Sequence, residues 1–287
     1  MAADDGLYLS TVRGIERAPL AGGEVTVVVP GARAMAIHRD GDALYWLQRT
    51  DTTWEVVRSD LSGGGRKVLA HGASGSAATL GWDNDDLYVA AGCSAQSVTV
   101  VPKRGGPPSR LVAPCDDGGM SGRGYLSVVA TGGFIAYRAS TDGDLDLLGP
   151  KSWHPTRPRL PFDEVASDGQ FFYGEQSGDR RDAWRHPLWR WKPDHPELLE
   201  RVGHMQDGLG VSSGPLAVDG GYALATSCPD EPVACTLNLL DIQARHATPV
   251  AAATVSQLHG YALRNGTVFV HYGSSIFRGS VRDLTAH

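Results

Sequence analysis

Residues 34–69 read AMAIHRDGDALYWLQRTDTTWEVVRSDLSGGGRKVL and contain one unit of a pattern that recurs along the chain. An alternating apolar segment comes first, the turn Asp40-Gly41-Asp42 follows, and the aromatic anchor Leu44-Tyr45-Trp46 comes next. Such alternation is typical of a half-buried strand, and Asp-Gly is typical of a tight hairpin turn. Two more strand-like segments follow, at 54–58 and 67–69. The stretch therefore predicts four consecutive antiparallel strands.

Similar anchors recur seven times, and six of them follow a turn that is rich in Asp, Asn or Gly. The anchors are Leu7-Tyr8, Leu44-Tyr45-Trp46, Leu87-Tyr88, Phe134-Ile135, Phe171-Phe172-Tyr173, Tyr222-Ala223-Leu224 and Val268-Phe269. Their mean spacing is about 44 residues, which is typical of four-stranded propeller blades. Sustained helical periodicity is absent from the pattern, so almost no helix is expected. We predict an all-β protein, a single β-propeller domain over residues 1–287.

The number of blades follows from the anchors and from a count of strands. Seven anchors favour seven four-stranded blades, and six blades with an extra hairpin is the alternative. Three strands are expected before Gly31 and three after Ser256, so the terminal blades are predicted to be incomplete or to share strands.

Two segments resemble a known repeat. Leu44-Tyr45-Trp46, followed by VRSDLSGGGRKVL at 57–69, resembles the Tyr-Trp-Thr-Asp (YWTD) repeat of propellers of the low-density lipoprotein receptor type. Residues 15–23 resemble the repeat of bacterial secreted propellers. The chain departs from the receptor motif because Leu47-Gln48 stand where Thr-Asp would be. The resemblance is good over residues 1–115. The motif packs one blade on the next, so the resemblance implies a propeller fold. Propellers of this kind are mostly binding modules, and some of their relatives are enzymes.

Charge and composition exclude several classes of protein. The formal net charge is −6, and Lys and Arg are scattered, whereas a general nucleic-acid binder needs clustered cations. No apolar stretch approaches the roughly 20 residues of a membrane span. No phosphate-binding glycine loop or dinucleotide motif is present. We therefore expect no nucleic-acid partner, no membrane span and no cofactor, and we expect a monomer whose partner is a protein or a small molecule.

The four cysteines indicate an oxidising compartment. Cys228 and Cys235 flank a short loop with two prolines that a disulfide could close, and Cys93 and Cys115 would then pair by default. Two disulfides imply an extracellular or periplasmic protein whose signal segment has been removed. The alternative is four free thiols in a cytoplasmic protein.

Candidate functional residues come from the loops on one face of the predicted propeller, here called the top face. It carries the connections between blades and the loops between second and third strands, so side chains from several blades converge there. The predicted ligand-binding residues are Arg33, His71, Asp116, His204, Asp207 and His259. Other loops of this face add Asp51, Asp142, Asp144, Glu175, Asp179 and Tyr272.

Two functions are compatible with these residues. The first is a binding module that recognises a protein or small ligand through the top face and the axial pocket. The alternative is an enzyme of the lyase, hydrolase or isomerase type, because His71, His204 and His259 come from different blades and imidazole serves in acid–base and metal chemistry. The sequence assigns no catalytic set and no metal site.

The disulfide prediction has a direct test. If Cys228 and Cys235 are bonded, titration of free thiols in the unfolded, unreduced protein detects neither of them. Recovery of four free thiols after aerobic purification would reject both the bridge and the oxidising compartment.

Overall fold

The computed structural model describes most of the chain. The described residues are 1–3, 5–51, 53–73, 78–91, 97–112, 128–138, 145–149, 152–160, 162, 164–175, 186–205, 216–227, 235–253, 258–273 and 275–285. The chain divides into two compact units, Met1–Arg159 and Leu160–His287. In the described part it forms 27 strands and one short helix.

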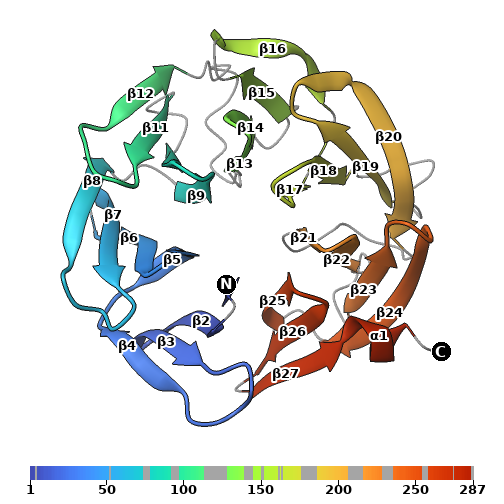
Figure 1. Ribbon diagram of the computed structural model, residues 1–287, viewed down its shortest axis with the longest axis horizontal. Helices are drawn as coiled ribbons and strands as arrows, with labels where there is room; N and C mark the ends of the chain where they lie inside the picture. The colour runs from blue at the N-terminus through green and yellow to red at the C-terminus, as the bar shows by residue number, and fades with distance from the viewer. Residues whose placement is uncertain are drawn as a thin grey trace. The chain divides into compact units, whose positions relative to one another are not determined.

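Unit 1 contains four antiparallel sheets, blades A to D, each with four strands in chain order (Figure 1). Blade A consists of β1 (Ala2–Ala3), β2 (Gly6–Thr11), β3 (Gly14–Ala18) and β4 (Thr26–Pro30). Blade B consists of β5 (Ala34–Asp40), β6 (Ala43–Arg49), β7 (Thr53–Asp60) and β8 (Lys67–Ala73). Blade C consists of β9 (Ala78–Trp82), β10 (Asp86–Ala91), β11 (Ser97–Pro102) and β12 (Ser109–Val112). Blade D consists of β13 (Val128–Thr131), β14 (Phe134–Arg138), β15 (Leu145–Gly149) and β16 (Ser152–Leu160).

Unit 2 contains three sheets of the same kind, blades E to G. Blade E consists of β17 (Glu164–Ser167), β18 (Phe172–Glu175), β19 (His186–Lys192) and β20 (His195–Met205). Blade F consists of β21 (Ala217–Asp219), β22 (Tyr222–Ser227), β23 (Cys235–Asp241) and β24 (His246–Ala253). Blade G has three strands, β25 (Leu258–Arg264), β26 (Thr267–Tyr272) and β27 (Ser275–Ser280), followed by α1 (Val281–Leu284).

This architecture is a seven-bladed β-propeller, which confirms the predicted fold class. Each of the seven anchors lies on, or overlaps, the second strand of its blade. Blade G has three strands, as the sequence predicted, whereas blade A has four. The missed strand is β1, which has only two residues and pairs Ala2 with Leu7 and Ala3 with Gly6. A strand of two small residues carries no alternation pattern, so the sequence could not show it.

Neighbouring side chains on an anchor strand enter two different cores. Tyr45 is 4% exposed and packs in the apolar cluster shared by blades B and C. Trp46 is 1% exposed and packs in the cluster shared by blades A and B. Successive side chains of a strand point to opposite faces, so blade B buries one face against blade A and the other against blade C. Tyr88 lies in the next cluster, between blades C and D.

The hairpin between the first and second strands is fixed by a tyrosine of the second strand. The Tyr88 hydroxyl donates to Asp83 Oδ2 at 2.7 Å, and Tyr173 donates to Asp168 Oδ2 at 2.8 Å in the equivalent place of blade E. Burial and the hydrogen bond to Asp83 raise the pKa of Tyr88. The neutral phenol therefore remains the donor, and in blades C and E an Asp–Tyr pair joins the turn to its strand.

A buried lysine joins blades B and C. The Lys103 ammonium donates to Asp40 Oδ2 at 2.8 Å and to the Asp83 carbonyl at 2.6 Å. Next to it, His38 is 7% exposed and stacks on Trp82 with ring centroids 4.4 Å apart. Burial, and then the charge of Lys103, lower the pKa of His38 to about 3, so this imidazole is neutral at physiological pH.

Of the four cysteines, the described residues include Cys235. Cys235 is buried at the first residue of β23, whereas Cys93, Cys115 and Cys228 lie outside the described residues. The bond between Cys228 and Cys235 stays a prediction. In the described part of the chain, no helix has the length and apolar character needed to cross a membrane.

The low pKa of His38 predicts acid sensitivity. The unfolded state binds this proton near pH 6.5, whereas the folded state binds it only near pH 3, so the free energy of unfolding falls as the pH drops through this window. His38→Phe keeps an aromatic ring but removes the titration. Between about pH 7.5 and about pH 5, the free energy of unfolding of the wild type should fall by about 2 kcal/mol more than that of the variant. The reason is that the uptake of one proton changes this free energy by about 1.4 kcal/mol per pH unit. Urea unfolding at both values measures the difference, and equal losses would contradict it.

Candidate functional site

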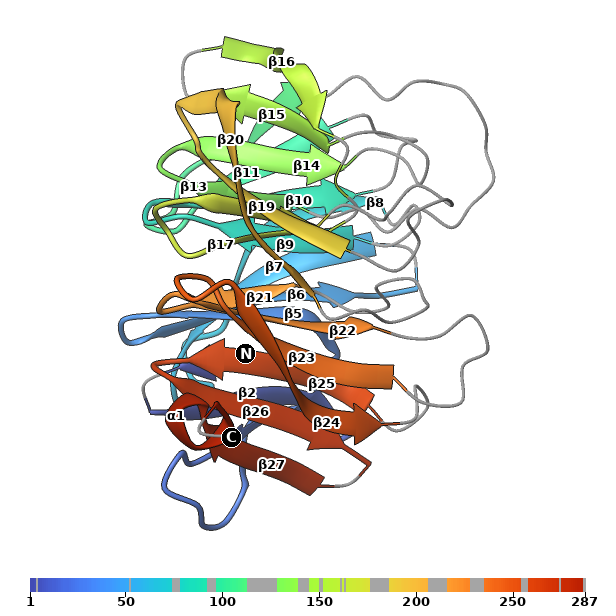
Figure 2. The same cartoon turned by 90° about the vertical axis from the view of Figure 1, so that its right-hand side faces the viewer.

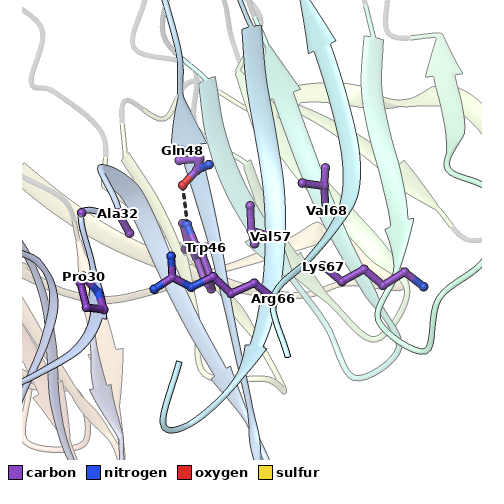
Figure 3. Close-up of a pocket in the computed structure, with 9 residues that line it drawn as sticks. Pro30, Ala32, Trp46, Gln48, Val57, Arg66, Lys67 and Val68 are labelled. Carbon is purple, nitrogen blue, oxygen red and sulfur yellow. Dashed lines mark hydrogen bonds between the residues drawn. The ribbon is translucent and has the colours of Figure 1, made fainter. Parts of the chain in front are cut away.

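A cavity of about 290 Å³ lies between blades A and B, within unit 1 (Figure 3). Its apolar lining consists of Pro30, Ala32, Trp46, Val57 and Val68. Its polar lining consists of Gln48, Arg66 and Lys67, and the backbone at Gly31 completes the wall. An apolar recess with a few convergent polar groups is the usual form of a small ligand site.

The strand register of blade B builds the floor. Trp46 on β6 pairs with Val57 on β7, which pairs with Val68 on β8, so these three side chains share the face that looks toward blade A. A β-bulge interrupts the β7–β8 ladder between Val56 and Val57. A bulge bends a strand locally and changes the direction of its side chains. The floor is therefore apolar and slightly irregular, which favours a recess over close packing.

The opposite wall comes from the end of blade A. Pro30 ends β4, and Gly31 follows with φ at +71°, in the left-handed region that glycine tolerates best. The Gly31 N–H donates to the Arg13 carbonyl at 2.9 Å, which holds this turn against blade A. The chain therefore leaves β4 sharply, and residues 30–32 form this wall of the cavity.

A row of hydrogen bonds crosses the inner wall. The Trp46 indole N–H donates to Gln48 Oε1 at 2.8 Å, and Gln48 Nε2 donates to Glu55 Oε2 at 2.8 Å. His71 lies directly opposite Glu55 across the β7–β8 ladder and so belongs to the same face. Gln48 stands where the receptor-type repeat would have Asp. The departure from the motif therefore places an amide that fixes the indole and faces the cavity.

Cations lie at the mouth of the cavity. Arg66 and Lys67 are both exposed, and Arg66 Nε donates to the Gly63 carbonyl at 3.2 Å. Figure 3 shows Arg66 extending toward Trp46 and Pro30, whereas Lys67 extends the opposite way. Arg33, also exposed, follows the lining residue Ala32 in the chain. Positive charge beside an apolar recess favours anionic ligands.

The predicted site residues fall into three groups. Arg33 follows the lining residue Ala32 in the chain, and His71 on β8 pairs with Glu55, which is bonded to the lining residue Gln48. The backbones of His204 on β20 and His259 on β25 are placed, but their side chains lie outside the described part, and so do Asp116 and Asp207. A joint site of His71, His204 and His259, and the enzyme that it would support, therefore stay predictions.

A second polar cluster lies in unit 2, on strands of blades E, F and G. Glu164 pairs directly with Glu175, which is 2% exposed at the end of β18. Burial raises the pKa of Tyr261 on β25, and the charges of Glu175 and then Glu164 raise it further, against an opposing contribution from Thr226 on β22. Sequence reasoning named Glu175 as a loop residue but missed Tyr261, because its strand reads as apolar.

Grouped metal ligands are not found in the described residues. Across those ranges, no set of three or more His, Cys, Asp or Glu side chains is arranged to hold a metal ion.

Comparison with solved structures supports the fold. The β-propeller domain of the Trilobed protease from Pyrococcus furiosus matches with a TM-score of 0.63 and 12% identity, over 94% of this chain and 90% of that one. A prolyl endopeptidase matches with a TM-score of 0.60 and 13% identity, over 93% of this chain and 44% of that one. A chain of a nidogen/laminin complex matches with a TM-score of 0.53 and 14% identity, over 85% of this chain and 91% of that one.

These similar proteins differ in what they do, so the likeness shows the propeller fold and no particular function. No protein-family model matches the sequence, and no curated protein matches it either. The resemblance to YWTD repeats therefore stays a prediction at the level of family.

Gln48→Met tests the hydrogen-bonded row. The change keeps the approximate volume but leaves the buried Trp46 N–H without its acceptor, and an unsatisfied buried donor costs about 1–3 kcal/mol. The free energy of unfolding, measured with urea, should fall by that amount. Gln170→Met is the matched control, because Gln170 is exposed and surface substitutions usually stay within about 0.5 kcal/mol. Equal small effects at both positions would show that the row is not needed for stability.

Proposed function

We propose that this propeller is a binding module whose ligand enters the cavity between blades A and B. The observation that carries the proposal is an apolar recess with a fixed indole at its floor and the Arg66 side chain at its mouth. The volume of about 290 Å³ lies at the lower end of ligand pockets, which suits a small molecule or one side chain of a protein partner.

The lining indicates the chemistry of the ligand. Arg66 offers a planar donor fork, which pairs best with a carboxylate or a phosphate. Val68, which is 47% exposed, offers branched apolar surface in the lining, and the buried side chains of Trp46 and Val57 support the floor. Glu55, bonded to Gln48, repels anions from the inner wall. A ligand is therefore expected to place its negative group at Arg66 and its apolar part against Val68.

The proposed location is extracellular or periplasmic, with the cytoplasm as the alternative. It rests on the predicted disulfide between Cys228 and Cys235, because such bonds persist in oxidising compartments.

The test compares benzoate with benzamide, which have almost the same shape but differ in charge. Titration of each into the 15N-labelled protein, followed by NMR, should move the Trp46 indole N–H signal with benzoate far more than with benzamide. Arg66→Ala should weaken benzoate binding about tenfold or more, because a hydrogen bond to a charged group is worth about 1.5–3 kcal/mol. Added salt should weaken it as well, since the charges at the mouth are exposed to solvent.

The matched control is Arg104→Ala. Arg104 is an exposed arginine near Asp85, in blade C, and does not line the cavity. Its removal should leave benzoate binding unchanged. Equal binding of benzamide and benzoate, or an equal loss in both arginine variants, would overturn the proposal of an anion-binding cavity.

A further inference from the structure

Among the described residues, the outer edge of blade G is formed by its third strand, β27. In the described part of the chain its sheet has the order β25-β26-β27, whereas each of the other six sheets has four strands. Figure 2 shows β25, β26 and β27 side by side, with β27 at the border of its sheet. One side of β27 therefore carries backbone N–H and C=O groups that no fourth strand of this sheet meets.

The outermost strands of the other blades each carry a feature that discourages further pairing. β-Bulges interrupt the ladders of β4, β8, β20 and β24. Prolines occur in four of the outermost strands, namely Pro30 in β4, Pro155 and Pro158 in β16, Pro196 in β20 and Pro249 in β24. The remaining strand, β12, has four residues in the described part of the chain. Bulges, prolines and short length are the usual means by which proteins protect a sheet edge.

β27 has none of these protections. Its six residues pair with β26 without interruption, from Tyr272 opposite Ser275 to Thr267 opposite Ser280. It contains no proline, and the Phe277 side chain is 57% exposed. A regular edge with an exposed aromatic residue is the form that accepts another strand.

We propose that β27 pairs in antiparallel orientation with β27 of a second copy of this chain, with Phe277 at the centre. The two three-stranded sheets then form one continuous sheet of six. The proposed dimer differs from the monomer that the sequence predicted. A twofold axis perpendicular to the sheet keeps each side chain on its own face of the sheet. Two residues can therefore stand opposite each other only if both have odd numbers or both have even numbers.

Parity and charge select the register. Centring on Phe277 places the two phenyl rings opposite each other and Ile276 opposite Arg278 of the second copy, and it pairs residues 275–279. Centring on Arg278 would oppose two guanidinium groups, and centring on Ile276 would pair only residues 275–277. The Phe277 register also ends before α1, whose Val281 N–H is bonded to the Gly266 carbonyl.

Cysteine cross-linking tests this register in the full chain. In Phe277→Cys the two new Cβ atoms lie about 4.5–5.5 Å apart, close to the span of a disulfide. Mild oxidation should therefore produce a dimer that is linked from position 277 to position 277, as located by mass spectrometry. In the control Ser275→Cys the equivalent atoms lie roughly 14 Å apart, so no 275–275 link should form. Equal cross-linking of both variants, or of neither, would overturn the register.

Light scattering during size-exclusion chromatography tests the dimer itself. The wild type should approach twice the chain mass as its concentration rises, and Phe277→Asp should stay at one chain mass. Leu198→Asp is the control, because Leu198 is an exposed apolar residue of the outermost strand of blade E. It should behave like the wild type. A monomeric wild type across the series, or a dimer that persists in Phe277→Asp, would overturn the proposal. A wild type that stays monomeric but binds an added extended peptide at β27 would overturn it as well.

Discussion

Blade B of this protein is apolar on both faces, because neighbouring residues of its second strand point in opposite directions. Tyr45 and Trp46 are adjacent in the chain, yet one packs toward blade C and the other toward blade A. A sheet with two apolar faces is not stable alone in water, so blade B depends on blades A and C beside it. The repeated anchors, the burial of the aromatic residues and the near absence of helix in the described residues all follow from this requirement.

Several polar groups of the described blades lie at or next to the turns between strands. Asp83 and Asp168 accept hydrogen bonds from tyrosines of their own blades, and Lys103 reaches from blade C to Asp40 of blade B. A buried charge is tolerated only with partners, and Lys103 has two. His38 shows the other solution, because burial beside Lys103 keeps its imidazole neutral.

The cavity between blades A and B lies beside three local features. Gln48 holds the Trp46 indole, a β-bulge follows Val56, and Pro30 ends β4 just before the chain turns. Gln48, Arg66 and Lys67 give the recess its polar lining. Blade G differs in another way, because in the described part of the chain its third strand lies at the edge of its sheet. The proposed functions therefore rest on local features of single blades.

The sequence by itself determined the fold class, the seven repeats and the anchors, because alternation and Asp-Gly or Asn-Gly turns are local patterns that need no tertiary information. It also marked Gln48 as a departure from the motif and placed Arg33 in a connection between blades. It was wrong to place His71 in a loop, because His71 lies on β8, opposite Glu55. It could not show β1, since two alanines carry no pattern, and it could not show Tyr261 beside the carboxylates of another blade. Only the tertiary structure decided that Trp46, Gln48 and Arg66 line one cavity and that β27 is an uninterrupted edge. Residues far apart in the chain meet through strand register and blade packing, and no local pattern encodes those distances.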